Sequence, residues 1–465
     1  MSSSILFARH EHHELPDGQH ATDDPLGFIM YLHIFAMGLA FGILYPVGMI
    51  FGLARSKWHV PTQITASCLA IVGFFLGHAH KGRQYSAHNI HSRFAKYLLF
   101  TAVAQVSLGV VLKLHIEKGL IGKIRRPLVI AHLVIAIIMP AFSWVQMGFG
   151  AITITGFCHE DHLGQCLAHG IMGSSFIAYG LFLLVMLFVG ERMLDRQGRS
   201  QEFYDNFIIT LWGIVNTFTE HRWGQPWNHK DYQHTAMGII WWCAGMVGLF
   251  LSRNGTRNHI PALVMIFTGY AMSQHSQNLE ISTKVHAMFG LALTCAGAAR
   301  IVEISFVLKD RPHRGPYIFA WQYLPPFLLV ESGMLFMGAT EEQMHYLHDI
   351  GIMHSSYILI LTSIAFLIFL LFLCLVNLYV RLAPPSSLSF PPTRVPDSDP
   401  DSFDLDLEEL DADHDDIEPY RANQGPRSAG TGARTSPERG PRNPPIIDGD
   451  NGAVEMQPFL SEDRR

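Results

Sequence analysis

The sequence predicts an all-α, polytopic transmembrane bundle of about 10–11 spans with a disordered C-terminal tail. Long apolar runs dominate residues 27–382, and many reach the roughly 20 residues that cross a bilayer. Basic residues gather in alternate loops between these runs, as the positive-inside rule expects. Residues 383–465 are instead polar and rich in Pro, Asp, Arg and Gly, a composition typical of disordered segments.

Composition divides the chain into four regions. They are a polar N-terminal segment (1–26), a four-helix module (27–156), a second transmembrane domain (157–382) and an acidic, Pro-rich tail (383–465). The first region has no apolar core, so we expect no cleavable signal peptide, and the first span would act as the insertion signal. The formal net charge of -6 comes largely from the tail and does not indicate nucleic-acid binding.

We expect eleven spans, of which the sixth is short and weakly apolar. The ranges are 27–53, 59–78, 94–114, 129–155, 167–190, 206–221, 234–252, 260–275, 285–307, 317–338 and 353–380. The sixth is retained because the basic loops after the fifth and seventh spans reach one membrane face only if it crosses. This topology puts the N-terminus outside and the tail in the cytoplasm, although Arg83, Arg93 and Lys96 then oppose the rule.

Six cysteines fall into two groups. Four lie inside apolar spans and are expected to be buried small hydrophobic residues: Cys68, Cys243, Cys295 and Cys374. Cys158 and Cys166 flank the polar loop CHEDHLGQC. These two would pair if the loop faces an oxidising lumen, and would remain free thiols otherwise.

Each of the first four spans opens with a histidine: His33, His59, His91 and His132. Consecutive spans run in opposite directions, so the first and third histidines would lie near one membrane face and the other two near the opposite face. Two facing imidazoles ligate a haem from both sides, which suits electron transfer rather than oxygen chemistry. We therefore take all four as metal and cofactor ligands of two haem b sites within 27–156. The alternative is four structural residues near the membrane interface. His88 lies one turn before His91, and only one of the two would ligate.

The second domain carries a partial repeat of the first at an offset of 200 residues. The motif HVP at 59–61 returns as HIP at 259–261. This copy adds His234 and His286 as candidate cofactor-binding residues, but no histidine is available to pair with His259. An alternative is a copper or zinc surface on the outer face, where further histidines gather: His159, His162, His169, His345, His348 and His354.

A few other residues are candidates because polar groups inside membrane spans are commonly functional. Glu331 is either hydrogen-bonded within the bundle or part of a proton or cation relay. Arg300 and Glu303 are expected to form a local ion pair. Glycines near the histidines allow close helix packing or leave room for a planar ligand: Gly38, Gly42, Gly48, Gly73, Gly77, Gly109, Gly148 and Gly150. The chain has no nucleotide-binding fingerprint.

The first four spans resemble the four-helix core of cytochrome b561-type proteins. The resemblance rests on His33-x3-Met37 and Tyr45-Pro46-x-Gly48 in the first span, followed by His59, His91 and His132. It implies paired haem b sites, His33 with His91 and His59 with His132, and electron passage from a cytoplasmic reductant such as ascorbate to an outer acceptor. Basic residues on the inner side would attract this or another small anionic reductant: Arg55, Lys57, Arg125 and Arg126.

Nearly the whole membrane region resembles a fungal group, the yeast putative transmembrane protein (YTP) family. The runs that carry this resemblance are GIIWWCAGMVGLFLSRNGTRNHIPA, PALVMIFTGYAMSQHSQNLEISTKVHAMFGLALTCAGAARIVEISFVLKD and MGATEEQMHYLHDIGIMHSSYILILTSIAFL. It implies a lipid-embedded, multi-pass protein of the secretory pathway, the vacuole or the plasma membrane. A second hypothesis follows from it, a non-enzymatic membrane protein or transporter of unknown activity with structural histidines.

Overall fold

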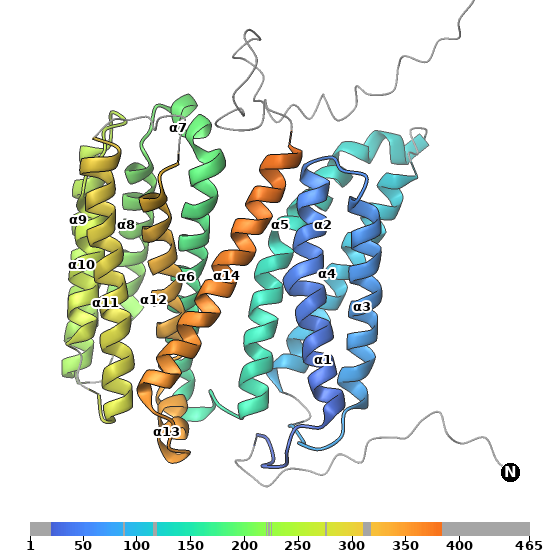
Figure 1. Ribbon diagram of the computed structural model, residues 1–465, viewed down its shortest axis with the longest axis horizontal. Helices are drawn as coiled ribbons and strands as arrows, with labels where there is room; N and C mark the ends of the chain where they lie inside the picture. Colours follow the sequence, from blue (N-terminus) through green and yellow to red (C-terminus); the bar gives the residue numbers. More distant parts are fainter. Residues whose placement is uncertain are drawn as a thin grey trace, which may run out of the picture. The chain divides into compact units, whose positions relative to one another are not determined.

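The computed structural model describes residues 20–86, 89–114, 119–219, 221, 224, 226–274, 277–309 and 318–383. Most of the predicted polar segment at the start (1–19), His88 and the tail from 384 onward lie outside these residues. Within the described ranges the chain is helical, with two isolated β-bridges and no named strand, which confirms the predicted all-α class (Figure 1).

The first module consists of two antiparallel helix pairs. α1 (Phe28–Leu39), the π-helical η1 (Ala40–Leu44) and α2 (Tyr45–Leu53) form one continuous rod, and α3 (His59–Ala79) packs along it. α4 (Ile90–Lys113) packs along α5 (Gly119–Thr155). α4 begins at Ile90 because the Asn89 side chain accepts a hydrogen bond of 2.9 Å from the backbone N–H of Ser92.

Two loops and the end of α5 meet at one end of this module. The loop before α1 pairs with the loop after α3 through the bridges Ala21↔Tyr85 and Leu26↔Gly82. Arg83 Nη1 then donates to the carbonyl of Ile154, near the end of α5, at 2.8 Å. We call this end the disulfide end, because α5 leads directly from it to the disulfide described below. The other end, which carries the α2–α3 turn, is called the opposite end.

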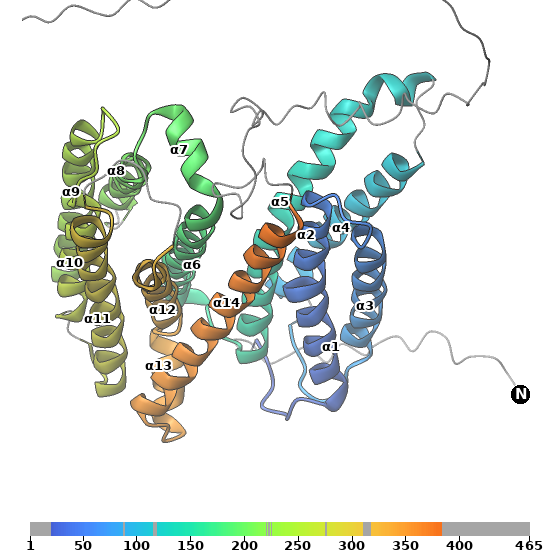
Figure 2. The ribbon, with the colours of Figure 1, turned by 45° about the horizontal axis from the view of Figure 1, so that its top comes forward.

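The second domain contains the remaining helices. They are η2 (Glu160–His162), α6 (Leu163–Val185), η3 (Met186–Gly190), α7 (Glu191–Gln197), α8 (Gln201–Thr219), α9 (His229–Leu251), α10 (Ile260–Ser273), α11 (Glu280–Val302), η4 (Glu303–Val307), η5 (Ala320–Tyr323), α12 (Leu324–Met337), α13 (Glu341–Asp349) and α14 (His354–Leu382). In both ribbon views α9, α10 and α11 lie side by side (Figures 1 and 2). The main hydrophobic core belongs to this domain and includes Leu184, Phe289 and Leu335, each at most 1% exposed.

Glycines bring several helices of the second domain into backbone contact. A Cβ added at Gly269 of α10 would lie 2.4 Å from the carbonyl oxygen of Gly290 on α11. A Cβ at Gly333 of α12 would lie 2.5 Å from that of Gly173 on α6. Such close approach is typical of membrane helix pairs. The α10–α11 and α6–α12 pairs are therefore closely packed.

Eight helical segments of the described chain are long and apolar enough to cross a membrane. All eleven predicted spans contain a helix, but three fall short of that standard. α10 and α12 have 14 residues each, about 21 Å at 1.5 Å per residue, against a hydrocarbon core of about 30 Å. α8 has buried polar residues, Glu202, Asp205 and Asn206, which lower its hydropathy.

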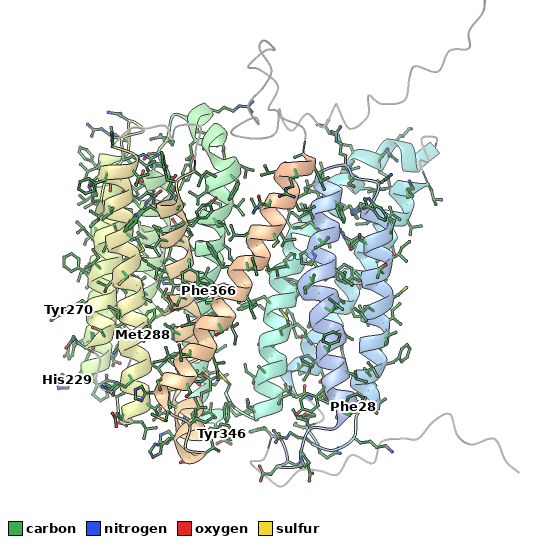
Figure 3. The ribbon with its side chains drawn as sticks, viewed as in Figure 1. Phe28, His229, Tyr270, Met288, Tyr346 and Phe366 are labelled. Atoms are coloured by element: carbon green, nitrogen blue, oxygen red, sulfur yellow. A yellow bond between two sulfur atoms is a disulfide. The ribbon has the colours of Figure 1, made fainter. Side chains whose placement is uncertain are left out.

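Large apolar side chains project outward from the helices, as a lipid-embedded bundle requires. Phe28, Tyr270 and Phe366 are 74%, 65% and 56% exposed (Figure 3). Soluble proteins rarely expose extended apolar surfaces. The same property makes the expected burial of four cysteines wrong. Lipid is as apolar as a protein core, so an apolar span does not imply a buried side chain, and the following are exposed: Cys68, Cys243, Cys295 and Cys374.

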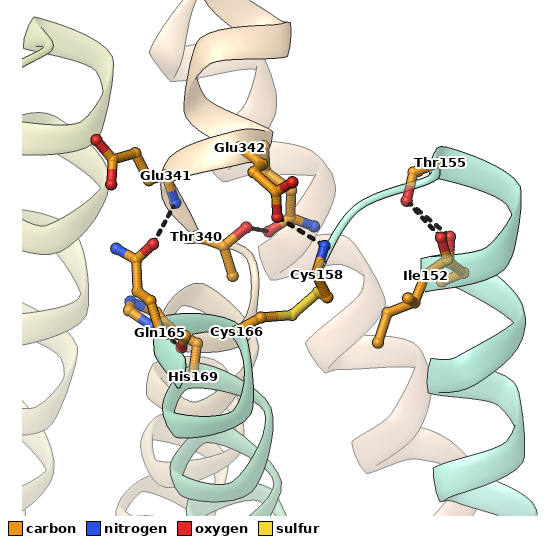
Figure 4. The surroundings of a disulfide bond; sticks show 11 residues. Ile152, Thr155, Cys158, Gln165, Cys166, His169, Thr340, Glu341 and Glu342 are labelled. Carbon is orange, nitrogen blue, oxygen red and sulfur yellow. Dashed lines mark hydrogen bonds between the residues drawn. A yellow bond between two sulfur atoms is a disulfide. The ribbon is translucent and has the colours of Figure 1, made fainter. Parts of the chain in front are cut away.

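The loop between α5 and α6 carries a disulfide. Cys158 and Cys166 are paired, with their Cα atoms 5.5 Å apart (Figure 4). The backbone N–H of Cys158 donates to Glu342 Oε2 at 2.7 Å, and the N–H of Glu341 donates to Gln165 Oε1 at 3.3 Å. These bonds tie the loop to α13. Of the two alternatives for this cysteine pair, the structure has the disulfide.

Candidate functional site

The first module brings its four span-opening histidines together as two pairs. His33 on α1 faces His91 on α4 with ring centroids 6.2 Å apart and ring planes at 87°. His59 at the start of α3 faces His132 on α5 at 6.4 Å and 89°. The first pair lies toward the disulfide end and the second toward the opposite end. Each pair joins one helix of the α1–α3 pair to one helix of the α4–α5 pair.

Backbone carbonyl groups orient three of these rings. Nδ1 of His33 lies 2.7 Å from the carbonyl oxygen of Gly73, and Nδ1 of His59 lies 2.7 Å from that of Gly48. Nδ1 of His91 lies 3.2 Å from the carbonyl oxygen of Gln146 and 3.0 Å from the side-chain Nε2 of the same residue. A carbonyl only accepts, so Nδ1 of His33 and of His59 carries the proton and donates it. The lone pair is then on Nε2, the arrangement that a metal-ligating histidine needs.

A glycine follows each accepting carbonyl by four residues. A methyl group at Gly77 would lie 2.7 Å from the His33 ring, one at Gly52 2.9 Å from the His59 ring, and one at Gly150 3.3 Å from the His91 ring. Because Cβ atoms tilt toward the helix N-terminus, a side chain at position i+4 would cover the carbonyl of residue i. Glycine at these positions therefore leaves the carbonyl groups accessible to the imidazoles.

His132 sits in the same arrangement but lacks the hydrogen bond to a carbonyl group. Its ring lies 3.4 Å from a methyl group added at Gly109, four residues after Gln105. Its Nδ1 is buried beside the backbone of Gln105 and has no partner within ordinary hydrogen-bond limits. All four histidines thus rest on a glycine of the neighbouring helix. Of the glycines singled out in the sequence, Gly38, Gly42 and Gly148 instead face open space.

The paired histidines fit a bis-imidazole haem. A metal–nitrogen bond of about 2 Å and about 1.1 Å from nitrogen to ring centre place two axial imidazole centroids about 6.2 Å apart. The observed 6.2 and 6.4 Å agree with this value. Buried polar atoms without a partner also concentrate in this module: Tyr85 Oη, Gln105 Oε1, His132 Nδ1, Gln146 Oε1 and Thr153 Oγ1. Buried polar atoms without a partner are uncommon in folded proteins, so their concentration here marks this module.

The candidate histidines of the second copy lie near a further histidine. His286 on α11 faces His169 on α6, with centroids 5.9 Å apart at 85°, and His234 lies within electrostatic range of His169. His259 Nε2 is 3.0 Å from Ser305 Oγ, so this ring contacts a hydroxyl group. The close α10–α11 contact has no counterpart between α3 and α4.

The sequence alone missed most of a buried charge cluster at the opposite end of the second domain. The predicted ion pair is confirmed, with Arg300 Nη1 2.5 Å from Glu303 Oε2. Glu202, which is fully buried, additionally binds Arg300 at 2.7 Å and Arg257 at 3.0 Å. No periodic signal connects positions this far apart in sequence. Tyr179 also donates a hydrogen bond to Asp205 beside this cluster.

Two other sequence expectations have structural outcomes. Thr362 Oγ1 of α14 donates to Glu331 Oε1 at 3.0 Å, which agrees with the interpretation of Glu331 as hydrogen-bonded within the bundle. For the copper or zinc surface, no three His, Cys, Asp or Glu side chains in the described part of the chain converge closely enough to hold a metal ion.

Comparison with known proteins gives family-level matches. Residues 142–380 match the family described as protein YTP1-like, C-terminal, and residues 13–115 match a domain of unknown function, DUF2427. The chain is 47% identical over 278 residues to protein YTP1 of Saccharomyces cerevisiae, covering 59% of this chain and 60% of that protein. It is 22% identical over 440 residues to the uncharacterized membrane protein C3B8.06 of Schizosaccharomyces pombe, covering 66% and 85%. No solved structure matches. Neither family description names a cytochrome b561, so that resemblance stays a prediction.

Proposed function

This chain belongs to the YTP1-like family of membrane proteins, and we propose that it is a haem b electron carrier that works across a membrane. The observation that supports this most strongly is the pair of imidazole pairs at opposite ends of one four-helix module. His33 with His91 and His59 with His132 would each hold one haem b through Nε2. Haem b, when bound, supplies reversible one-electron chemistry, and two axial histidines leave it no position for oxygen.

The helices set a separation between the two sites that suits electron transfer through the bilayer. On α5, His132 and the residue whose carbonyl holds His91, Gln146, are 14 positions apart, or about 21 Å at 1.5 Å per residue. On the α1–α2 rod, His33 and Gly48 give nearly the same interval. The module would thus carry an electron in two steps between the membrane faces.

The electron donor is proposed to be a small anionic reductant such as ascorbate, which binds at the opposite end. Arg55 and Lys57 lie in the turn just before His59, and Arg125 and Arg126 precede His132 by two turns. By the positive-inside rule this end faces the cytoplasm, and the disulfide end faces a lumen or the exterior. The disulfide is consistent with that orientation because such bonds persist in oxidising compartments.

Haem content of the purified full chain tests this proposal. We expect about two haem b per chain, with the sharp reduced bands of six-coordinate haem. His33→Ala and His132→Ala should each lose about one haem, and the double variant both. His345→Ala is the matched control, because that side chain is 51% exposed and faces none of the four rings. A folded, monodisperse protein that stays colourless after haem supplementation would instead favour structural histidines.

The donor site has its own prediction. Lys57→Gln combined with Arg126→Gln should slow the reduction by ascorbate several-fold at low salt, since both side chains are exposed and their charge steers an anion. The difference should shrink at high ionic strength. Lys81→Gln, at the disulfide end, is the control. Stopped-flow reduction rates at two salt concentrations measure this effect. If the double variant is reduced as fast as the Lys81→Gln control, Lys57 and Arg126 do not belong to the donor site.

A further inference from the structure

The second domain holds a third imidazole pair in a different environment. His169 of α6 and His286 of α11 have ring centroids 5.9 Å apart and ring planes at 85°. Their exposures are 7% and 4%, so both rings are buried inside the helix bundle rather than at a loop. The spacing and the angle resemble those of the two pairs in the first module, but this third pair is more deeply buried.

Hydrogen bonds fix both rings in the tautomer that a metal ligand requires. Nδ1 of His169 donates to the carbonyl oxygen of Gln165 at 2.9 Å, and Nδ1 of His286 to that of Ser282 at 2.9 Å. Each acceptor lies one turn earlier on the same helix. Nε2 of both rings is therefore left with a lone pair. Nε2 of His169 is buried and has no hydrogen-bond partner in the described chain, which is costly unless a ligand uses it.

The surroundings exclude a haem at this pair. Phe336 of α12 stacks on the His169 ring with centroids 4.5 Å apart and ring planes at 12°. Phe289, one turn from His286, packs on Phe336 at 4.7 Å and is 1% exposed. A porphyrin plane between the two imidazoles would displace these aromatic rings. A single ion needs no such space.

We propose that His169 and His286 bind one monovalent copper ion between their Nε2 atoms. Two metal–nitrogen bonds of about 2 Å in a line would place the centroids about 6.2 Å apart, and the observed 5.9 Å lies within about 0.3 Å of this value. Imidazole suits copper, and Cu(I) accepts two ligands in a line. A divalent zinc ion is disfavoured, because zinc takes four ligands and no three donor side chains converge here within the described residues.

Charge supports the monovalent ion as well. Both proposed ligands are neutral imidazoles in an apolar core, and burying a doubly charged ion without a carboxylate carries a large desolvation penalty. The third nearby histidine, His234, lies within electrostatic range of His169 but is not needed for a two-coordinate site. The site lies in the second domain and does not depend on haem in the first.

Copper retention by the purified full chain tests this proposal. The protein is loaded with Cu(I) under anaerobic conditions, dialysed against a Cu(I) chelator and measured by mass spectrometry. The wild type should keep about one ion per chain, and X-ray absorption should show two nitrogen ligands at about 2 Å. His169→Gln and His286→Gln should each bind at least about tenfold more weakly. The exposed His345→Gln should bind like the wild type.

A second readout separates loss of binding from loss of folding. Ag(I), a redox-inert substitute, should raise the melting temperature of the wild type by mass action and should not raise that of His169→Gln. Size-exclusion profiles establish whether the variants remain folded. The proposal is overturned if the wild type retains no Cu(I) and shows no Ag(I) shift, if His169→Gln binds as tightly as the wild type, or if the wild type holds a third haem that His169→Gln loses.

Discussion

Gly77→Ala is expected to abolish haem binding at the His33–His91 site and to leave the other site occupied. The added methyl group would lie 2.7 Å from the His33 ring and would push it away from the Gly73 carbonyl that orients it. Alanine favours a helix over glycine by up to about 1 kcal/mol, so a loss of haem could not come from a weakened helix. Haem content and the reduced spectrum of the purified variant measure the effect.

The matched variants make this test specific. Gly52→Ala, with 2.9 Å to His59, should empty the other site, whereas Gly109→Ala, with 3.4 Å to His132, should have a smaller effect. Gly148→Ala and Gly38→Ala place their methyl groups in open space and should keep both haems. If all five variants keep two haems, the glycine–carbonyl arrangement does not control the ligands.

Glu202→Gln is expected to destabilise the second domain by about 3–5 kcal/mol, because it removes one negative charge that two buried guanidinium groups share. Glu202 pairs with both arginines, at 3.0 Å to Arg257 and 2.7 Å to Arg300. Thermal or denaturant unfolding in detergent measures the change. Glu341→Gln, whose side chain is 42% exposed, is the charge-matched control and should shift stability by less than about 1 kcal/mol.

Haem content gives this variant a second use. The charge cluster lies in the second domain, so Glu202→Gln should lower stability without emptying the haem sites of the first module. An unfolding midpoint equal to that of the wild type would show that the cluster does not stabilise this domain.

Much of the fold was predictable because membrane helices follow from length and apolarity alone. The grouping of His33 with His91 and of His59 with His132 at opposite ends follows from the alternation of span direction. Apolarity did not predict which face of a span turns inward, so the cysteine prediction was wrong. It also could not show that α10 and α12 are short, since an apolar run continues into the flanking loops.

Contacts between helices that are distant in the chain could not be predicted from the sequence. Glu202 and Arg300 are in contact although they are 98 positions apart in the sequence, and nothing in the sequence near Glu202 points to Arg300. His286 faces His169, which precedes the repeat. The role of Gly52 was not predicted, because it depends on the His59 ring that faces this glycine. The spacings Gly48–Gly52, Gly73–Gly77, Gln105–Gly109 and Gln146–Gly150 are present in the sequence, but only the structure shows that an imidazole faces each of them.

The most direct test of two bis-histidine haems in perpendicular ring geometry is an electron paramagnetic resonance spectrum of the oxidised, purified protein. The ring planes stand at 87° and 89°. Perpendicular axial imidazoles give low-spin ferric haem a highly anisotropic signal, clearly distinct from that of parallel rings. We expect two such signals, one lost in His33→Ala and the other in His132→Ala. A high-spin signal, or no haem signal from folded and haem-supplemented protein, would contradict the account.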